Sequence, residues 1–448
     1  MLEFTVASSS LELREDDCSA KGGLSIGSGR MILVRDPFGD PAAAAARFLR
    51  RLAFIILMIV APVGEVLSRG VLYILLPVGA AILVIAGLLD GAELARRRIV
   101  DAFMTSIGIA VVFLTFWAAL SLVWTPFPID AGAQLGRTLL TGFITFLAIV
   151  SLPERARISN IYLLPVGVAI TSVAAFLMIL FGPDTFWQAA DPDTTLAQRC
   201  IMSVSILLWP ALGALALRER FIMAAALAFV VAAAVLAVFT QIALIALLVA
   251  TLAYVIAMTD ALRTARIIAS ALAVLMLGAP LFVALLYPFI VLAHAAYGSP
   301  ILVFSDLVVH EWPRFITGHG LDMAERAIAL GLLPPDTPRS IVFTLWYELG
   351  IVGVAAFTFL ASAVLLAVGR LPQHVAPAIL AALVAGLVIA IFGAETIQLW
   401  WITLNGMAAI ALALLVKAHP QSKRPLAPAP DEEAELEEGM DFDHEPQF

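Results

Sequence analysis

The sequence predicts an all-α polytopic membrane protein of about twelve transmembrane helices. Hydrophobic residues make up 62% of its 448 residues and charged residues only 13%, whereas soluble domains carry about 25% charged residues. The apolar residues also form runs of about twenty, the length of helix that crosses a bilayer core of about 30 Å. These two observations exclude an ordinary soluble domain.

Each apolar run is interpreted as one membrane span. The runs cover residues 51–67, 70–89, 102–122, 131–152, 158–181, 197–217, 220–239, 241–259, 264–291, 341–368, 375–393 and 397–416. The longest connector, residues 292–340, lies between the ninth and tenth spans. A transporter built from inverted repeats would show matching broken helices in its two halves, and none is visible.

Most basic residues of the connectors fall on one side of the predicted bundle. They are Arg47, Arg50, Arg51, Arg96, Arg97, Arg98, Arg155, Arg157, Arg218, Arg220, Arg263, Arg266, Arg370, Lys417, Lys423 and Arg424. Because cytoplasmic loops are enriched in Lys and Arg, we expect both termini inside the cell and the 292–340 connector outside. Residues 47–417 then form the transmembrane domain.

The two ends of the chain are polar. Residues 1–46 lack the basic start and apolar core of a signal peptide and are expected to form a cytoplasmic arm. After Ala418 the chain holds nine acids and two bases, which leaves 25 acids and 24 bases elsewhere, so the net charge of −8 belongs to the tail. With several prolines and few apolar residues, the tail 418–448 is expected to be disordered.

The segment from Ile316 to Gly353 is the most promising place for chemistry. Its polar first part cannot lie in hydrocarbon exposed to lipid, because its backbone groups would lack hydrogen-bond partners. His319 stands between two glycines and is a candidate base near neutral pH, or else an ordinary loop residue. Asp322 and Arg326 are spaced for an ion pair on a short helix. Glu348 is a second candidate base, or else favours the start of the helix it opens.

Six basic residues are expected toward the outer side of the membrane, and all are Arg: Arg69, Arg137, Arg199, Arg314, Arg326 and Arg339. Guanidinium groups bind phosphate in a bidentate manner, so this set predicts recognition of a diphosphate or an anionic lipid head. With only three Lys in the chain, the preference for Arg is also explained by composition.

These arginines differ in their expected settings. Arg137 is set two turns into the fourth span, where it either faces a cavity or is paired. Arg199 can reach lipid phosphate or pair with an Asp at the outer end of the sixth span. Arg69 is expected to be a turn residue.

Other kinds of site are not indicated by the sequence. The six His are scattered, and none pairs with a carboxylate at a metal-ligand spacing, so no metal or cofactor is expected. Cys18 and Cys200 are too few and too differently placed for a disulfide framework. No phosphate-binding loop, dinucleotide fingerprint or nucleophile elbow is present, and we expect no nucleic-acid partner.

The outer segment resembles the O-antigen ligase and polysaccharide polymerase family of bacterial inner-membrane proteins. Ile316–Leu321 is similar to a Pro-Leu-Thr-Gly-x-Gly-Leu element of the family, and Trp346–Gly353 to Trp-x-Glu-Leu-Gly-x-x-Gly. Ser121–Thr125 is similar to a looser element. Thr337–Ser340 stands where members carry His-Pro-His-Asn, so both His are replaced. Thr240-Gln241 stands in place of a Ser-x-Ser-Arg-like element.

The resemblance implies a GT-C-like fold with a large periplasmic loop, here residues 292–340. It also implies metal-free transfer of a glycan from undecaprenyl diphosphate to a hydroxyl of lipid A-core or of a growing polysaccharide. Arg199, Arg314 and Arg339, with Arg137 and Arg326, would hold the diphosphate or glycan, and His319 or Glu348 would act as the base. Membrane lipids are the other expected partners.

Two alternatives follow from the same residues. The loss of the His pair at 337–339 favours a catalytically inert homologue that binds a lipid-linked glycan or partners an assembly complex. A lipid or small-solute transporter is compatible with the number of spans, but the near absence of charge within them argues against ion coupling.

Overall fold

The computed structural model describes residues 41–68, 70–90, 99–153, 156–181, 196–293, 299–310, 314–335, 337–393 and 399–419. Most of the expected arm and almost all of the acidic tail lie outside these residues. So do Arg69, Arg96–Arg98, Arg155, Cys18 and most of the connector 182–196.

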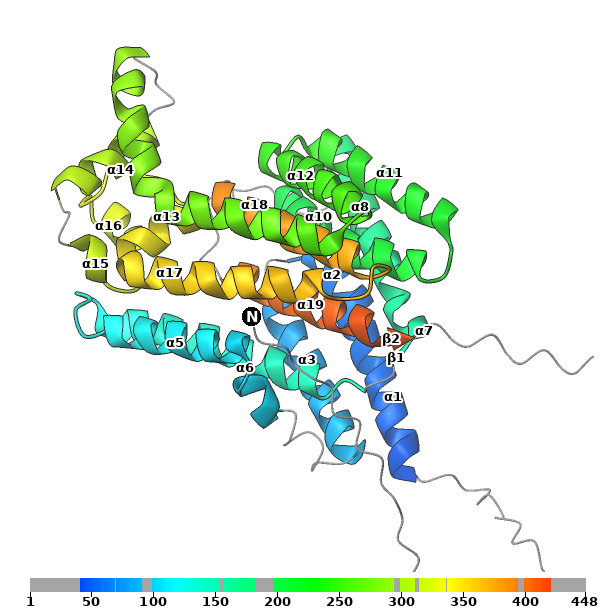
Figure 1. Cartoon of the computed structure of the whole chain (residues 1–448). Coiled ribbons are helices and arrows are strands. Elements are labelled where there is room, and N and C mark those ends of the chain that lie inside the picture. Colours follow the sequence, from blue (N-terminus) through cyan, green and yellow to red (C-terminus); the bar gives the residue numbers. More distant parts are fainter. Residues whose placement is uncertain are drawn as a thin grey trace, which may run out of the picture. The chain divides into compact units, whose positions relative to one another are not determined.

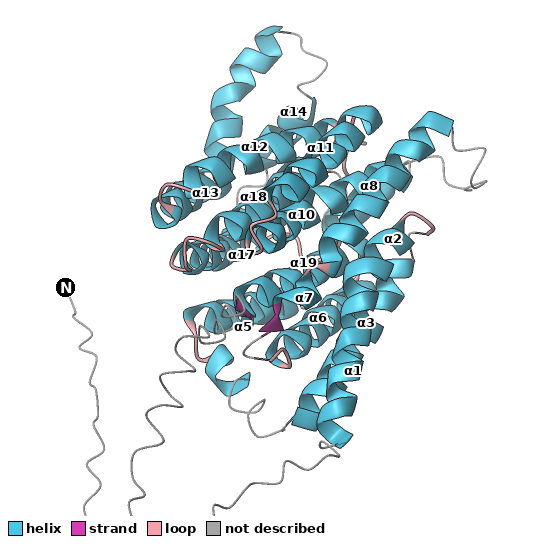
Figure 2. Ribbon diagram, turned by 90° about the vertical axis from the view of Figure 1, so that its right-hand side faces the viewer, coloured by secondary structure: helices cyan, strands magenta, loops and turns pink. Residues whose placement is uncertain are grey.

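The described chain is almost entirely helical, as predicted (Figures 1 and 2). Its helices are α1 (Pro41–Ile55), the π-helix η1 (Ile56–Val60), α2 (Ala61–Glu65), α3 (Val71–Asp90), α5 (Ser106–Ser121), α6 (Pro128–Val150), α7 (Ile158–Ile161), α8 (Leu163–Phe181), α10 (Leu196–Ala216), α11 (Phe221–Val238), α12 (Gln241–Ala257), α13 (Ala261–Ala293), α14 (Ser299–His310), α15 (Arg314–Thr317), α16 (Met323–Ala329), α17 (Ile341–Gly369), α18 (Ala376–Phe392) and α19 (Leu399–Lys417). The strands β1 (Ala156–Arg157) and β2 (Ala418–His419) pair in parallel.

The helices are those of a multi-pass membrane protein. Among the described residues, eight helices are long and apolar enough to cross a bilayer, namely α3, α6, α8, α10, α11, α13, α17 and α19. The apolar helices α5, α12 and α18 are shorter. The first expected span falls on the consecutive segments α1, η1 and α2.

Three contacts join segments that the charge pattern assigns to the same side. At one end, the Arg218 guanidinium lies 4.7 Å from the centre of the Tyr162 ring, and the Lys417 Nζ donates to the carbonyl of Leu152 at 3.1 Å. At the other, Thr125 Oγ1 donates to the carbonyl of Leu321 at 3.2 Å. The connectors that the charge pattern assigns to one side therefore meet each other.

The described chain runs slightly past the predicted end of the transmembrane domain. Ala418 and His419, the first residues assigned to the tail, pair with Ala156 and Arg157. The pairing satisfies backbone groups that follow α19, which composition alone does not predict.

The predicted outer connector also contains more helix than expected. The ninth span continues to Ala293, and α14 follows within the segment assigned to the loop. The short helix predicted near Asp322 is confirmed as α16.

Helix α17, which carries Trp346–Gly353, packs between α13 and α5 (Figure 1). Buried side chains of α13, α16, α17 and α18 form one apolar core, which includes Met276, Ala327, Phe343 and Leu380. The outward faces of many helices are apolar and exposed, as expected of helices that contact lipid.

Candidate functional site

The loop Thr317–Leu321 docks onto a break in α17. Gly350 has φ 64° and ψ −166°, a conformation incompatible with a helix. In an unbroken helix the carbonyls of Tyr347, Glu348 and Leu349 would accept from amides four residues on. The break frees these carbonyls, so they need other donors inside a largely apolar bundle.

Each freed carbonyl receives a donor from elsewhere in the chain. The amide of His319 donates to Tyr347 O at 2.8 Å, and the amide of Gly320 to Glu348 O at 3.0 Å. The Trp117 Nε1 donates to Leu349 O at 2.9 Å. The loop and the broken helix therefore complete each other's hydrogen bonds, which fixes His319 against α17.

Glycine is required where the two segments touch. Gly318, Gly320 and Gly350 all have positive φ. A Cβ on Gly318 would collide with the carbonyl of Glu348, and a Cβ on Gly320 would lie 2.6 Å from the Thr125 Cβ. Since only Gly permits this approach at low cost, the glycines flanking the histidine serve the docking.

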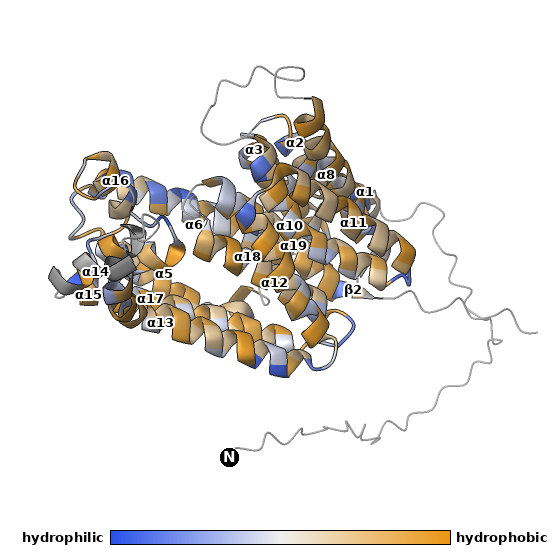
Figure 3. Ribbon diagram, turned by 90° about the horizontal axis from the view of Figure 1, so that it is seen from above, coloured by the Kyte–Doolittle hydropathy of each residue, from blue (hydrophilic) through white to orange (hydrophobic). Residues whose placement is uncertain are grey.

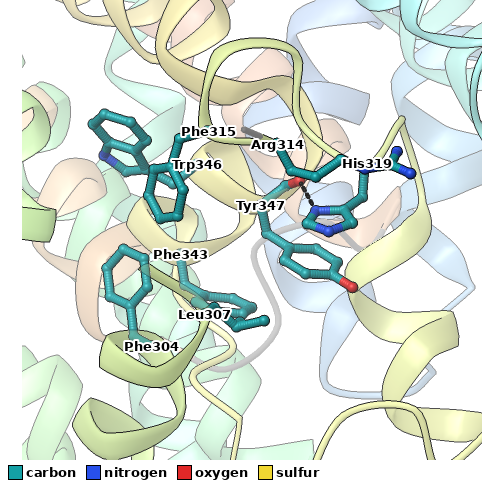
Figure 4. Close-up of a pocket in the computed structure, with 8 residues that line it drawn as sticks. All are labelled: Phe304, Leu307, Arg314, Phe315, His319, Phe343, Trp346 and Tyr347. Atoms are coloured by element: carbon teal, nitrogen blue, oxygen red, sulfur yellow. Dashed lines mark hydrogen bonds between the residues drawn. The ribbon is translucent and has the colours of Figure 1, made fainter. Parts of the chain in front are cut away.

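The His319 ring is held in one orientation. It stacks on the Tyr347 ring with centroids 4.1 Å apart, and its Nδ1 lies 3.1 Å from the Tyr347 carbonyl oxygen (Figure 4). Because a carbonyl only accepts hydrogen bonds, Nδ1 carries the proton in the neutral ring and Nε2 carries the lone pair. Nε2 is therefore the nitrogen able to take a proton.

A small cavity lies beside His319. Its volume is about 10 Å³, roughly enough for one water molecule. The lining combines two basic side chains with a wall of large, mostly apolar ones, namely Arg314, His319, Phe304, Leu307, Phe315, Phe343, Trp346 and Tyr347 (Figure 4). The structure thus brings Arg314 and His319 together at the same cavity. This cavity is large enough for a single reacting group and too small for a complete ligand.

Glu348 has a structural role that the sequence did not indicate. It lies inside α17 and not at its start, so it does not favour the N-terminus of the helix that carries it. Its carboxyl is buried, and Oε1 accepts from the amide of Ala324 at 3.1 Å, in the first turn of α16. The carboxyl therefore anchors α16 to α17.

Arg326 and Arg137 line a second, polar cavity between α6 and α16. Arg326 Nε lies 2.7 Å from Asp322 Oδ2, as the spacing predicted, and its Nη1 lies 3.1 Å from Asp130. The hydrogen bond to Asp322 is the main reason that the pKa of Arg326 is raised. Arg137 is exposed at this cavity. The sequence places Arg137 two turns into the fourth span, facing a cavity or paired, and here it faces the cavity together with Asp130 and Gln134 of the same helix.

Arg199 belongs to a different cluster. It is 6% exposed, and its guanidinium lies 5.8 Å from the centre of the Trp400 ring. The Glu65 carboxyl interacts electrostatically with Arg199 and accepts a hydrogen bond from Ser203 Oγ at 2.6 Å. Arg199 is thus buried between α2, α10 and α19 and does not extend toward lipid.

Sequence reasoning missed Glu65. The residue lies within the first expected span and is 3% exposed. It is therefore an exception to the predicted near absence of charged residues within the spans. A lone acidic residue near the end of an apolar run was the available signal.

The remaining candidates are not brought to the His319 cavity. Arg339 is exposed in the segment before α17, and no described contact ties it to the cavity. Among the described residues, no group of three or more His, Cys, Asp or Glu side chains is arranged to hold a metal ion.

Comparison with known proteins found no match. No protein-family model matches the chain, and no curated protein matches it.

Proposed function

We propose that this chain is a membrane glycosyltransferase of the O-antigen ligase or polysaccharide polymerase kind. It transfers a glycan from an undecaprenyl-diphosphate-linked donor to an acceptor hydroxyl at the periplasmic face of a bacterial inner membrane. The proposal includes twelve spans, cytoplasmic termini and a periplasmic segment 292–340. It rests on the family resemblance of the loop and on the positive-inside rule.

The observation that carries the proposal is the shared cavity of Arg314 and His319. The two elements on which the resemblance rests, Ile316–Leu321 and Trp346–Gly353, are the two that dock through backbone hydrogen bonds. This docking places the His319 imidazole, whose lone pair is on Nε2, at the same cavity as the Arg314 guanidinium. A base and a cation at one point are what the proposed reaction requires.

The chemistry balances without a metal. The acceptor oxygen attacks the anomeric carbon of the donor while His319 Nε2 takes the acceptor's proton. The bond between that carbon and the diphosphate oxygen breaks, and undecaprenyl diphosphate leaves with one more negative charge. Arg314 stabilises this charge, and the docked loop supplies the positioning.

The test replaces His319 by Asn in the full-length protein. An Asn amide can still donate to Tyr347 O, but it has no basic nitrogen. Loss of a general base lowers the rate by about 10²–10⁴-fold, so surface glycan made by cells that carry this variant should shorten or disappear. His374→Asn, at an exposed histidine in the connector before α18, is the matched control. Unchanged glycan in His319→Asn cells, with normal protein levels, would end the proposal.

A catalytically inert homologue is the second candidate. It is favoured by the size of the His319 cavity and by the structural use of Glu348 as an anchor of α16. This alternative predicts that the purified protein binds a lipid-linked glycan without releasing undecaprenyl diphosphate. Detection of the released lipid by mass spectrometry would exclude it.

The buried Glu65 cluster is the one observation that favours a transporter. Ionisable groups buried among membrane helices are typical of ion pathways. In proteoliposomes, a transporter would show solute or proton flux that Glu65→Gln abolishes, while a glycan transferase would show none.

A further inference from the structure

The polar cavity between α6 and α16 differs in chemistry from the cavity at His319. It is an open groove of about 320 Å³, at the lower end of the range of about 300–1,000 Å³ for small-molecule sites. Asp130, Gln134 and Arg137 line it from α6, and Glu325 and Arg326 from α16, with Asp322 just before that helix. In Figure 3, blue marks hydrophilic residues on the ribbon between the labels α16 and α6.

The charges of the groove disfavour a diphosphate. Two carboxylates, Asp130 and Asp322, already hold the Arg326 guanidinium, and Glu325 adds a third negative charge. Arg137 is then the cation without an ion-pair partner among the described residues of the groove. A lipid diphosphate would meet a net negative surface, which argues against Arg326 as a diphosphate ligand.

We propose that this groove binds uncharged sugar residues of the glycan and delivers them to His319. This inference rests on the proposed function and assigns the groove to the glycan rather than to the diphosphate. Each sugar hydroxyl both donates and accepts hydrogen bonds. The groove offers carboxylates that accept hydrogen bonds, guanidinium groups that donate them and an amide that does both, so it can satisfy both roles of a hydroxyl. The Arg326 guanidinium is held rigid by its two carboxylates.

The position of the groove supports delivery to His319. Asp322, which lines the groove, is three residues from His319 in the chain, a span of at most about 11 Å. The intervening Leu321 is fixed through its carbonyl by Thr125. A sugar chain bound in the groove thus has only this short segment of chain to cross before it meets the imidazole that would accept the proton.

The test measures glycan binding by the full-length protein in nanodiscs. Saturation-transfer NMR compares neutral tetrasaccharides of hexoses and N-acetylhexosamines with uronic-acid tetrasaccharides and inorganic pyrophosphate. We expect at least one neutral tetrasaccharide to bind. Glu325→Leu should weaken binding about tenfold, the value of one charge-assisted hydrogen bond, and Gln134→Leu, which removes a neutral hydrogen bond, about threefold. Glu219→Leu, at an exposed glutamate after α10, is the control and should leave binding unchanged.

Three binding results would overturn the inference. They are no binding of any neutral tetrasaccharide, binding that both groove variants leave intact in folded protein, and pyrophosphate binding that Arg137→Ala removes. Glycan binding that depends on Glu325, in a protein without transfer activity, keeps the inference and ends the proposed function. Transfer by Glu325→Leu with an unchanged KM for the lipid-linked glycan would overturn the inference and keep the proposed function.

Discussion

Replacement of Gly350 by Ala tests whether the break in α17 holds the His319 loop. Gly350 has φ 64° and ψ −166°, a region used almost only by glycine that costs other residues about 1–3 kcal/mol. A Cβ at this position would lie 2.5 Å from the Ile316 carbonyl oxygen and 2.8 Å from the Gly318 nitrogen. The loop must therefore move away from α17.

The magnitude follows from the contacts that this movement breaks. The amides of His319 and Gly320 lose their bonds to α17, of 2.8 and 3.0 Å, each worth about 0.5–1.5 kcal/mol net. Together with the backbone strain, the docked loop loses about 3 kcal/mol, or about a hundredfold in its docking equilibrium. The freed α17 carbonyls regain helical partners, which favours the undocked state further.

Hydrogen exchange measured by mass spectrometry reads this equilibrium directly. In wild-type protein the amides of residues 317–322 should exchange slowly, and in Gly350→Ala about a hundredfold faster. Gly331→Ala is the matched control, because Gly331 also has a positive φ of 71° but a Cβ there would meet nothing within 4 Å. Equal exchange in wild type and Gly350→Ala, or equal acceleration by Gly331→Ala, would refute the coupling between loop and helix break.

Three further substitutions test the supporting contacts. Trp117→Phe removes the donor to Leu349 O, so thermal unfolding should show a loss of about 1–3 kcal/mol for the unsatisfied carbonyl. Glu348→Gln keeps an acceptor for the α16 amide and should retain most glycan transfer, whereas loss of a true base costs about 10²–10⁴-fold. Lys417→Met removes the donor to two carbonyls at the end of α6 and should lower stability by about 1–2 kcal/mol.

Each of these has a comparison that can contradict it. Trp124 packs against Trp117, but its Nε1 has no partner among the described residues, so Trp124→Phe should cost less than Trp117→Phe. Glu348→Leu should unfold α16 and raise hydrogen exchange there, and a Glu348→Gln variant as inactive as Glu348→Leu would restore Glu348 as a candidate base. Arg220→Met, at an exposed arginine, should leave the unfolding temperature unchanged, unlike Lys417→Met.

The local pairing of Asp322 and Arg326 could be predicted because it depends on helical spacing alone. The second partner of Arg326, Asp130, could not, because it lies on a helix almost two hundred residues earlier in the chain. The same limit applies to Glu65 and Ser203, which are brought together only by the packing of α2 against α10.

The sequence by itself determined that this is a helical membrane protein, since the length and composition of apolar runs decide whether a segment can cross a bilayer. It also singled out the loop around His319, because polar residues stand out among apolar helices. Only the tertiary structure decided that the loop docks on a break in α17 and that Glu348 anchors α16. The physical reason is that a broken helix must find donors for its carbonyls wherever the fold supplies them. Here they come from Trp117 and from the amides around His319.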